Sequence, residues 1–254
     1  MTQRWKLTIE YDGTPFMGWQ RQKHGDSVQQ VLEDAYGKMT GDPNIRLHVC
    51  GRTDAGVHAV GQVAHVDLDE KYSEKEVRDA PNYHSGEWPV AVLKAEKVSD
   101  DFHARFNTKK RYYRYRITCD LPTEPQLDAM RSWHNKNDLD IDAMRAGAEK
   151  LLGKHDFTSF RASHCQGKSP IKTVDSIEVS EFHDPLRPGR QILIDVSARS
   201  FLHHQVRNFA GILKEVGEGK RTPQDVADIL QACDRTQAGI TAPAHGLYFV
   251  KAEY

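Results

Sequence analysis

The sequence contains few cysteines, no long apolar run and no apolar leader. Its cysteines are scattered, at Cys50, Cys119, Cys165 and Cys233. None forms a CxxC or Cys–His spacing, so we expect no zinc site, and unpaired cysteines are typical of a reducing compartment. No stretch of about 18 apolar residues would span a membrane, and the first residues alternate like a strand. We therefore expect a cytoplasmic protein without membrane segments.

Net charge is also nearly absent. The chain has 254 residues with 35 basic and 36 acidic side chains, a formal net charge of -1. This balance excludes a uniformly basic nucleic-acid binder, but a local cluster of one sign remains compatible with RNA. The length suits one large or two medium domains that need neither disulfides nor a metal for stability.

Two periodicities alternate along the chain. Apolar residues at every second position, as in Trp5–Tyr11 and Ile192–Ala198, predict half-buried strands. Apolar residues three or four positions apart, as in 28–39 and 202–216, predict helices. Hairpin-like spacing favours antiparallel sheets. We predict the α+β class, with two α/β domains over 1–107 and 108–254 whose mainly antiparallel sheets are flanked by helices.

Short patterns predict where helices begin and end. Ser27 and Ser73 are each followed three residues later by Gln or Glu, which is the capping-box pattern. Thr222 precedes a proline, which suits the first helical position. Gly153 is predicted to follow the end of the helix that includes Leu151.

A run rich in cations and tyrosines opens the second predicted domain. Residues 104–117 have the sequence ARFNTKKRYYRYRI, with no acidic residue. Cations neutralise phosphates and aromatic rings stack on bases, so the run predicts a nucleic-acid contact. Alternatively, it is a strand whose outer face is kept solvated by Lys and Arg. The candidate RNA-binding residues are Arg105, Lys109, Lys110, Arg111 and Arg114.

Arg207 lies in the segment SFLHHQVRN at 200–208. One helical turn after His203 and beside the apolar stripe, it is expected to be partly buried and to need an anion. A structural salt bridge would meet the same need. His203 and His204 are adjacent, so we expect their side chains to point apart and to make a poor metal pair.

The loop 51–56, GRTDAG, lies between two predicted strands and carries a cation and a carboxylate. Asp54 in a glycine-bounded turn is most often an Asx turn or a helix cap. If the stretch is extended, Arg52 and Asp54 point to the same side. The cation would then lower the pKa of the carboxyl group and keep it an anionic nucleophile.

These motifs, in this order, resemble the tRNA pseudouridine synthase A (TruA) family over nearly the whole chain. The matching segments are EYDGTPFMGWQRQ at 10–22, GRTDAGVHAVGQVAHV at 51–66, DFHARF at 101–106, KKRYYRY at 109–115, LLGKHDFTSFRA at 151–162, SFLHHQVRN at 200–208 and DRTQAGITAPAHGLYFV at 234–250. GRTDAGVHA is highly specific. The chain departs from the family at 82–89, NYHSGEWP, which lacks the usual Leu-Pro pair.

The resemblance implies roles for single residues. Asp54 matches the catalytic aspartate and Tyr113 the active-site tyrosine. Arg207 matches the arginine that pairs with the aspartate, and Arg52 an arginine that helps capture the flipped base. Leu247 falls among the substrate-binding positions.

The resemblance also implies a reaction and a partner. The family converts uridine to pseudouridine at positions 38, 39 and 40 of the tRNA anticodon arm. It uses no cofactor or metal, and it works as a homodimer with tRNA across a basic cleft between the domains. The target base must be flipped out of its helix before an enzyme carboxylate reaches it.

The roles of the candidate residues in the chemistry stay open at several points. Asp54 attacks C1′, attacks C6, or removes a sugar proton to give a glycal. Tyr113 either packs under the uracil or helps to remove the C5 proton. Tyrosine with an ordinary pKa near ~10 is a weak base at neutral pH, which favours packing.

Two other functions fit parts of the sequence. A tRNA-binding module or folding chaperone without turnover would explain the tyrosine-rich strand equally well. A hydrolase of a small glycoside or nucleoside would need a second carboxylate near Asp54. Asp67 and Asp69 are the nearest candidates in sequence.

Overall fold

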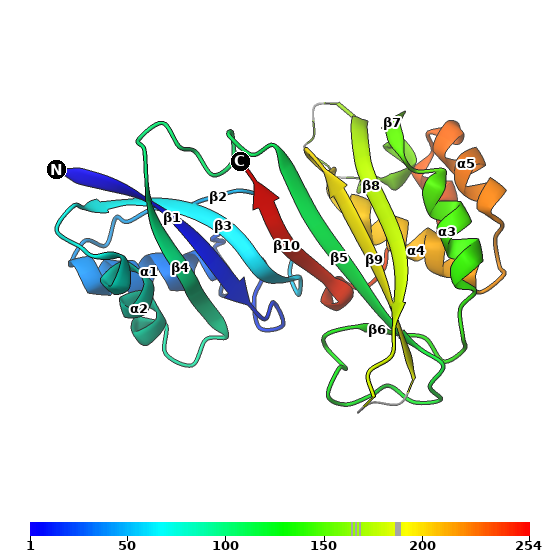
Figure 1. Ribbon diagram of the computed structural model, residues 1–254, viewed down its shortest axis with the longest axis horizontal. Helices are drawn as coiled ribbons and strands as arrows, with labels where there is room; N and C mark the ends of the chain where they lie inside the picture. Colours follow the sequence, from blue (N-terminus) through cyan, green and yellow to red (C-terminus); the bar gives the residue numbers. More distant parts are fainter. Residues whose placement is uncertain (164, 166, 168, 186–188) are drawn as a thin grey trace. The chain divides into compact units, whose positions relative to one another are not determined.

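The computed structural model describes the chain except residues 164, 166, 168 and 186–188. The described residues form two compact units (Figure 1). The first unit comprises Met1–Lys109 together with Tyr248–Tyr254, and the second comprises Lys110–Leu247. Both combine helices with a largely antiparallel sheet, which confirms the predicted α+β class.

The sheet of the first unit has the strand order β4-β1-β3-β10, and β2 pairs with β3. Its strands are β1 (Thr2–Tyr11), β2 (His48–Val49), β3 (His58–Asp69), β4 (Val90–Val98) and β10 (Leu247–Glu253). β1 runs antiparallel to both β3 and β4, whereas β10 runs parallel to β3. The last residues of the chain therefore complete a sheet that the first residues begin.

Helices α1 (Val28–Thr40) and α2 (Glu74–His84) cover one face of this sheet (Figure 1). The alternating residues of β1 point into the core beneath them, where Trp5, Leu7 and Ile9 are fully buried. Leu32 of α1 and Val77 of α2 are also fully buried. Burial of each large apolar side chain contributes roughly 1.5–3 kcal/mol, so this layer stabilises the unit without a covalent staple.

The second unit has the strand order β5-β9-β8-β7, with each pair antiparallel, and a short strand β6 beside β5. The strands are β5 (Lys110–Cys119), β6 (Trp133–His134), β7 (Gly153–Asp156), β8 (Ile171–Phe182) and β9 (Arg190–Ala198). Residues in register across β5 and β9, such as Tyr115 and Ile194, are both fully buried. The predicted alternation of these strands is confirmed.

Helices α3 (Ile141–Glu149), α4 (Gln205–Gly217) and α5 (Pro223–Ala232) cover one face of this second sheet (Figure 1). Three short 3-10 turns complete the unit: η1 (Thr158–Phe160), η2 (Arg235–Gln237) and η3 (Ala244–Gly246). A cluster of aromatic rings joins η1 to α4, with Phe157 and Phe160 centred 5.5 and 5.2 Å from Phe209. This contact fixes α4, the helix that carries Arg207.

Most of the predicted helix boundaries are confirmed. Ser27 caps α1, and Ser73 and Thr222 form full capping boxes at the starts of α2 and α5. The prediction for Gly153 is wrong, because α3 ends at Glu149 and this glycine begins β7 with a φ of 92°. Among the described residues, none of the helices has the length and apolar character needed to cross a membrane.

Candidate active site

The loop 51–56 is fixed to the first unit through the side chain of Thr53. Its hydroxyl group lies 2.7 Å from the buried hydroxyl of Tyr11 on β1. Gln62 of β3 donates to that tyrosine oxygen at 3.3 Å and to the carbonyl of Gly51 at 3.0 Å. Burial raises the pKa of Tyr11 to about 12, so its hydroxyl stays protonated. A buried hydrogen-bond network therefore holds the middle of the loop.

Two glycines in the segment 10–22 let a second stretch of backbone support the loop. A Cβ on Gly18, whose φ is +90°, would lie 2.6 Å from the carbonyl oxygen of Thr53. A Cβ on Gly13 would lie 2.1 Å from the carbonyl oxygen of Val57. The amide of Trp19 donates to the Thr53 carbonyl at 3.1 Å. Because only glycine tolerates this close approach, the two motifs form one structural unit.

Arg52 and Asp54 lie on either side of the inward-pointing Thr53. Arg52 is exposed and Asp54 is half-buried, whereas Thr53 is buried. The carbonyl of Asp54 accepts from the amide of Val57 at 3.1 Å, and Gly56 takes a φ of 77° in this turn. The turn thus leaves the aspartate side chain at the surface of a rigid loop.

His58, the first residue of β3, ties the loop to two other segments. Its Nδ1 accepts from the amide of Gly13 at 3.0 Å. Its ring stacks on Tyr248 of β10, with centroids 4.8 Å apart. The histidine is buried, and its contacts join the turn after β1, β3 and the terminal strand.

Arg207 is held at a close approach between α4 and the segment 240–243. Its Nε donates to the carbonyl of Ala242 at 2.8 Å, and the amide of Ala242 donates to the carbonyl of Arg207 at 3.2 Å. A Cβ on Gly211, one turn later, would lie 2.0 Å from the carbonyl oxygen of Ile240. The arginine is half-buried, as expected from its place beside the apolar stripe.

Tyr113 lies two residues before Tyr115 on β5, so both side chains point to the same face of the sheet. Tyr113 is half-buried, and its ring meets that of Phe201 edge-on at 5.2 Å. Tyr115 is fully buried and donates to the carbonyl of Pro243 at 2.8 Å. Its pKa is raised by burial, while the charge of Arg207 acts in the opposite direction. Leu247 is buried at the start of β10.

The prediction for the two neighbouring histidines is wrong. α4 begins only at Gln205, and His204 takes a left-handed conformation with a φ of 64° before it. His203 therefore lies outside the helix and does not share a helical face with Arg207. The two imidazole rings do not point apart either, because their centroids are 3.9 Å apart. A left-handed residue changes the side-chain directions that helical spacing would give.

The candidate RNA-binding residues differ in how far their charges are already paired. Arg114 forms two hydrogen bonds with Asp195 of β9, at 2.8 and 2.9 Å, and this carboxylate raises its pKa. The Nζ of Lys110 lies 3.4 Å from a carboxylate oxygen of Asp175. The guanidinium group of Arg111 donates to the carbonyl of Arg199.

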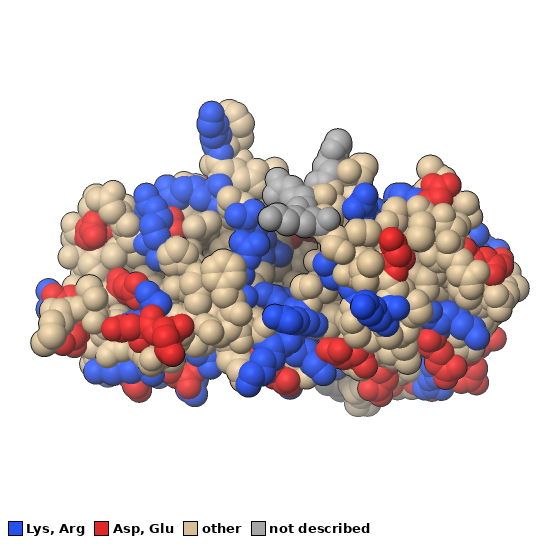
Figure 2. Space-filling view, turned by 90° about the horizontal axis from the view of Figure 1, so that it is seen from above, with Lys and Arg blue, Asp and Glu red and all other residues tan. Residues whose placement is uncertain are grey.

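Arg105 and Lys109 are exposed in the segment before β5. Figure 2 shows the Lys and Arg side chains gathered in adjoining groups rather than spread evenly. The near-zero net charge is therefore compatible with locally basic surface.

The carboxylates that a hydrolase would require are far along β3 from the loop. Asp67 is the tenth residue of a strand that starts at His58, which places it roughly 30 Å from that start at about 3.3 Å per residue. It forms a bidentate pair with Arg4, with both distances 2.7 Å. Glycosidase carboxylates lie roughly 5–10 Å apart, so neither Asp67 nor Asp69 serves Asp54 as a partner.

The sequence analysis missed the residues that hold the loop. Tyr11, Gln62 and His58 lie within the strand patterns and have no spacing that distinguishes them from other alternating residues. Only the pairing of β1 with β3 brings the tyrosine hydroxyl to Thr53. The signal in the sequence was the pair of glycines at positions 13 and 18, which marks a close backbone approach.

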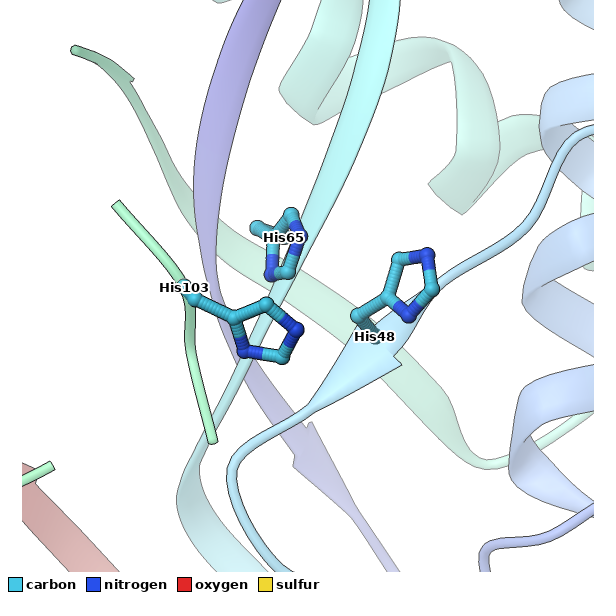
Figure 3. Close-up of side chains that lie close together, drawn as sticks. All are labelled: His48, His65 and His103. Atoms are coloured by element: carbon cyan, nitrogen blue, oxygen red, sulfur yellow. The ribbon is translucent and has the colours of Figure 1, made fainter. Parts of the chain in front are cut away.

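Three histidines of the first unit also lie together (Figure 3). His48 of β2, His65 of β3 and His103 of the segment after β4 each place a ring nitrogen within 4.8 Å of the others. This spacing approaches that of a metal-ligand group. The hydrogen bonds of their other nitrogens determine which ligand they suit, and we call these three residues the histidine patch.

Comparison with known proteins places the whole chain in one family. The model of the tRNA pseudouridine synthase family matches residues 7–107 and 148–254. A tRNA pseudouridine synthase A of Paramagnetospirillum magneticum is 55% identical over 251 residues, which cover 99% of this chain and 95% of the relative. The protein of the same name from Rhodospirillum centenum is 51% identical over 252 residues, 99% of this chain and 100% of the relative.

A third relative and one solved structure complete the comparison. The tRNA pseudouridine synthase A of Bradyrhizobium diazoefficiens is 52% identical over 251 residues, 99% of both chains. A solved structure titled as an unknown protein from Galdieria sulphuraria is 10% identical and covers 86% of this chain and 94% of its own. Its TM-score of 0.24 is too low to bear on the fold. From the family match and the near-complete relatives, we conclude that the chain belongs to the tRNA pseudouridine synthase family, the isomerases that convert uridine to pseudouridine in tRNA.

Proposed function

We propose that the chain isomerises uridine at positions 38, 39 and/or 40 of the tRNA anticodon stem-loop, with Asp54 as the catalytic carboxylate. The observation that carries this proposal is the rigid loop of the first unit, in which the buried Thr53 leaves Asp54 at the surface. A nucleophile or base must be held close to its reacting atom to be effective. The network around Tyr11 supplies that rigidity.

The proposed reaction is balanced without an external oxidant or reductant. The N1–C1′ bond breaks, the uracil turns, and a C5–C1′ bond forms. C5 then loses its proton and N1 gains one, so the number of protons is unchanged. The target base is first flipped out of the RNA, at a cost of a few kcal/mol. Asp54 either attacks C1′ or C6 or removes a sugar proton, and in each case it acts as an anion.

The remaining site residues have proposed roles in binding the flipped base. Arg52, exposed beside the aspartate, captures it, and Tyr113 packs under the uracil. Arg207, fixed by Ala242, pairs with the catalytic carboxylate, and Leu247 lines the base site. The protein acts on tRNA as a cytoplasmic homodimer, and the exposed Arg105 contributes to RNA binding.

An Asp54→Ala variant tests the catalytic role. Removal of a catalytic nucleophile typically lowers turnover roughly 10⁴-fold or more, while tRNA binding, which depends on phosphate contacts, changes little. Pseudouridine is mapped chemically in anticodon-arm tRNAs that carry uridine at each of the three positions. An Asp54→Asn variant is the matched control for shape. Retained turnover in either variant contradicts the assignment of Asp54.

The same map separates turnover from binding alone. A tRNA-binding module or folding chaperone would bind these tRNAs and leave every uridine unchanged. We expect wild-type protein to convert at least one of the three positions within minutes under single-turnover conditions. Binding without any conversion would support the binding module instead.

A further inference from the structure

The histidine patch is built by strand register and by one turn. His48 and His65 are direct partners in the pairing of β2 with β3, so their side chains share a face of the sheet. Their rings stack with centroids 4.8 Å apart. His103 meets His65 edge-on at 4.7 Å and lies 5.8 Å from His48. Figure 3 shows the three rings lying close together.

Hydrogen bonds fix the tautomers of two of these histidines. The Nδ1 of His65 accepts from the buried amide of Ala104 at 3.2 Å. The Nδ1 of His103 accepts from the amide of Arg105 at 3.1 Å. A neutral imidazole whose Nδ1 is an acceptor carries its proton on Nε2. The free nitrogens of both rings are therefore N–H donors.

This tautomer disfavours a metal ion. A metal binds a ring nitrogen that carries no proton, and its histidine ligands then donate from the other nitrogen. At His65, that arrangement would leave the buried amide of Ala104 without its acceptor, which destabilises the fold. The patch instead offers the Nε2–H groups of His65 and His103 as hydrogen-bond donors. Such donors suit a ligand with several acceptor oxygens, such as a phosphate group.

His65 is the most buried of the three histidines. Only 2% of the surface of this residue remains exposed. Among the described residues no hydrogen bond of its Nε2 is seen, and this nitrogen is not one of the enclosed side-chain atoms that lack a partner, so solvent reaches it. Burial, followed by the charges of His48 and Arg4, lowers its pKa to about 4, so the ring is neutral at pH 7. The Nε2–H of this neutral ring is therefore a donor that an acceptor from outside the protein can reach.

The surface beside the patch suits RNA. Phe106 is 74% exposed, and its ring lies 4.3 Å from that of His103. The guanidinium group of Arg105 lies 5.8 Å from the centre of the same phenyl ring. An exposed aromatic ring next to a cation is the arrangement on which nucleic-acid bases stack. Asp67, two residues after His65, forms a bidentate pair with Arg4.

We propose that the histidine patch binds one phosphate group of the tRNA backbone through the Nε2–H groups of His65 and His103, while Phe106 stacks on a neighbouring base. The inference rests on the proposed function to the extent that tRNA is the substrate. It adds an RNA contact on the first unit that is separate from the loop of Asp54. A neutral N–H bonds a phosphate without neutralising it, which gives the contact a distinct salt signature.

Two substitutions of His65 separate the loss of its Nε2–H donor from the loss of its structural hydrogen bond with Ala104. Asn retains an acceptor near the Nδ1 position for Ala104 but has no donor at the Nε2 position, whereas Gln places its amide near the Nε2 position. We expect His65→Asn to weaken tRNA binding about tenfold, the usual scale for a hydrogen bond to a charged group. We expect His65→Gln to bind within about threefold of wild type. His84→Asn, on α2, is the control for loss of a surface imidazole.

The salt dependence of binding identifies the type of contact. Affinity is measured by filter binding from 50 to 300 mM KCl. We expect His65→Asn to lower affinity with the slope unchanged, because no charge is lost. Arg105→Ala should reduce the slope by about one, because a cation that releases counterions is lost. Equal affinity of His65→Asn and wild type would overturn the proposal and leave water as the acceptor.

Substitution of single phosphates in the RNA and titration with a metal ion identify the ligand of the patch. Anticodon-arm RNAs with single neutral methylphosphonates are bound to wild type and to His65→Asn. At one position, the methylphosphonate should weaken RNA binding by the wild type and leave binding by the variant unaffected. If no position behaves in this way, the ligand is not an RNA phosphate. Calorimetry with inorganic phosphate tests for a site that takes free anions. Micromolar binding of Zn²⁺ that His65→Asn abolishes would replace the proposal with a metal site.

The two proposals fail independently. Turnover that survives in Asp54→Ala would remove the proposed catalytic role and leave the binding data for the patch intact. Normal binding by His65→Asn, with Asp54→Ala inactive, would remove the patch and leave the proposed function intact. Single-turnover rates at saturating enzyme should be unchanged in both His65 variants, because the patch contributes binding and not chemistry.

Discussion

The two units hold their candidate site residues in different ways. The first unit places Asp54 on a loop that a second segment, a buried tyrosine and two glycines keep in position. The second unit places Tyr113 on a regular strand and Arg207 on a regular helix. The backbone hydrogen bonds of a strand or helix already fix where each side chain starts, whereas the position of a loop residue depends on specific contacts. Substitutions at those contacts should therefore affect the two units unequally.

Glycine-to-alanine substitutions test the comparison with the largest expected effect. In Gly18→Ala, the new Cβ meets the Thr53 carbonyl at 2.6 Å with φ at +90°, and in Gly211→Ala it meets the Ile240 carbonyl at 2.0 Å. We expect both to lose about 3 kcal/mol or more of unfolding free energy in urea. Gly41→Ala, where a Cβ has nothing within 4 Å, is the control at another left-handed glycine. Wild-type stability in Gly18→Ala would show that the loop moves freely.

Removal of one hydroxyl from each unit gives a sharper test. Tyr11→Phe leaves the buried hydroxyl of Thr53 without its partner, and Tyr115→Phe leaves the Pro243 carbonyl without its donor. Each should cost about 1–2 kcal/mol in stability. We expect turnover at saturating tRNA to fall about tenfold in Tyr11→Phe and less than twofold in Tyr115→Phe, because β5 remains held by β9. Equal losses of turnover would contradict the comparison.

The buried histidine of the first unit gives that unit its own dependence on pH. Burial lowers the pKa of His65 to about 4, against an ordinary value of about 6.5 for histidine. Its folded state binds fewer protons, so its contribution to stability is complete above pH 6.5 and is lost as the pH falls toward 4. We expect the loss of stability between pH 7 and pH 5 to be about 1–2 kcal/mol smaller in His65→Gln than in wild type.

The measurement is urea unfolding at several pH values. Carboxylates that lie away from His65 also lose stability in acid, and they do so equally in both proteins. The difference between the two curves isolates His65. Parallel curves would show that the imidazole is not held neutral by the fold.

The smallest expected effect concerns the basic residues. Arg114 is paired with Asp195 in the second unit, whereas Arg105 of the first unit is exposed. We expect Arg114→Ala to change stability by less than about 1 kcal/mol and to leave the salt slope of tRNA binding nearly unchanged. Arg105→Ala should reduce that slope by about one. A larger slope change in Arg114→Ala would mean that RNA replaces Asp195 as its partner.

The local elements were largely predictable because each depends on neighbours in sequence. Alternation marked β1 and β9, and capping patterns marked the starts of α2 and α5. The errors occurred where one residue takes a left-handed conformation. His204 does so before α4, and Gly153 does so at the start of β7. Neither apolar periodicity nor capping chemistry reports such a change.

The support around the candidate site could be predicted only in part. Motif order singled out Asp54, Tyr113 and Arg207, whose roles stay predictions. The contacts that hold them were not predictable, because Tyr11 and Gln62 are ordinary members of alternating strands. The histidine patch had no signal at all, since its members are 17 and 38 residues apart and meet only through the register of β2 with β3 and the turn after β4.

The sequence by itself determined the class of fold, the family and the loop that carries Asp54. It could do so because periodicity, caps and motif order are local or linear properties. Only the tertiary structure decided that residues 248–254 complete the first sheet, that Gly13 and Gly18 support the loop, and that the Nδ1 of His65 accepts from the amide of Ala104. Those features depend on strand pairing and on backbone approach across long sequence separations, which no local pattern records.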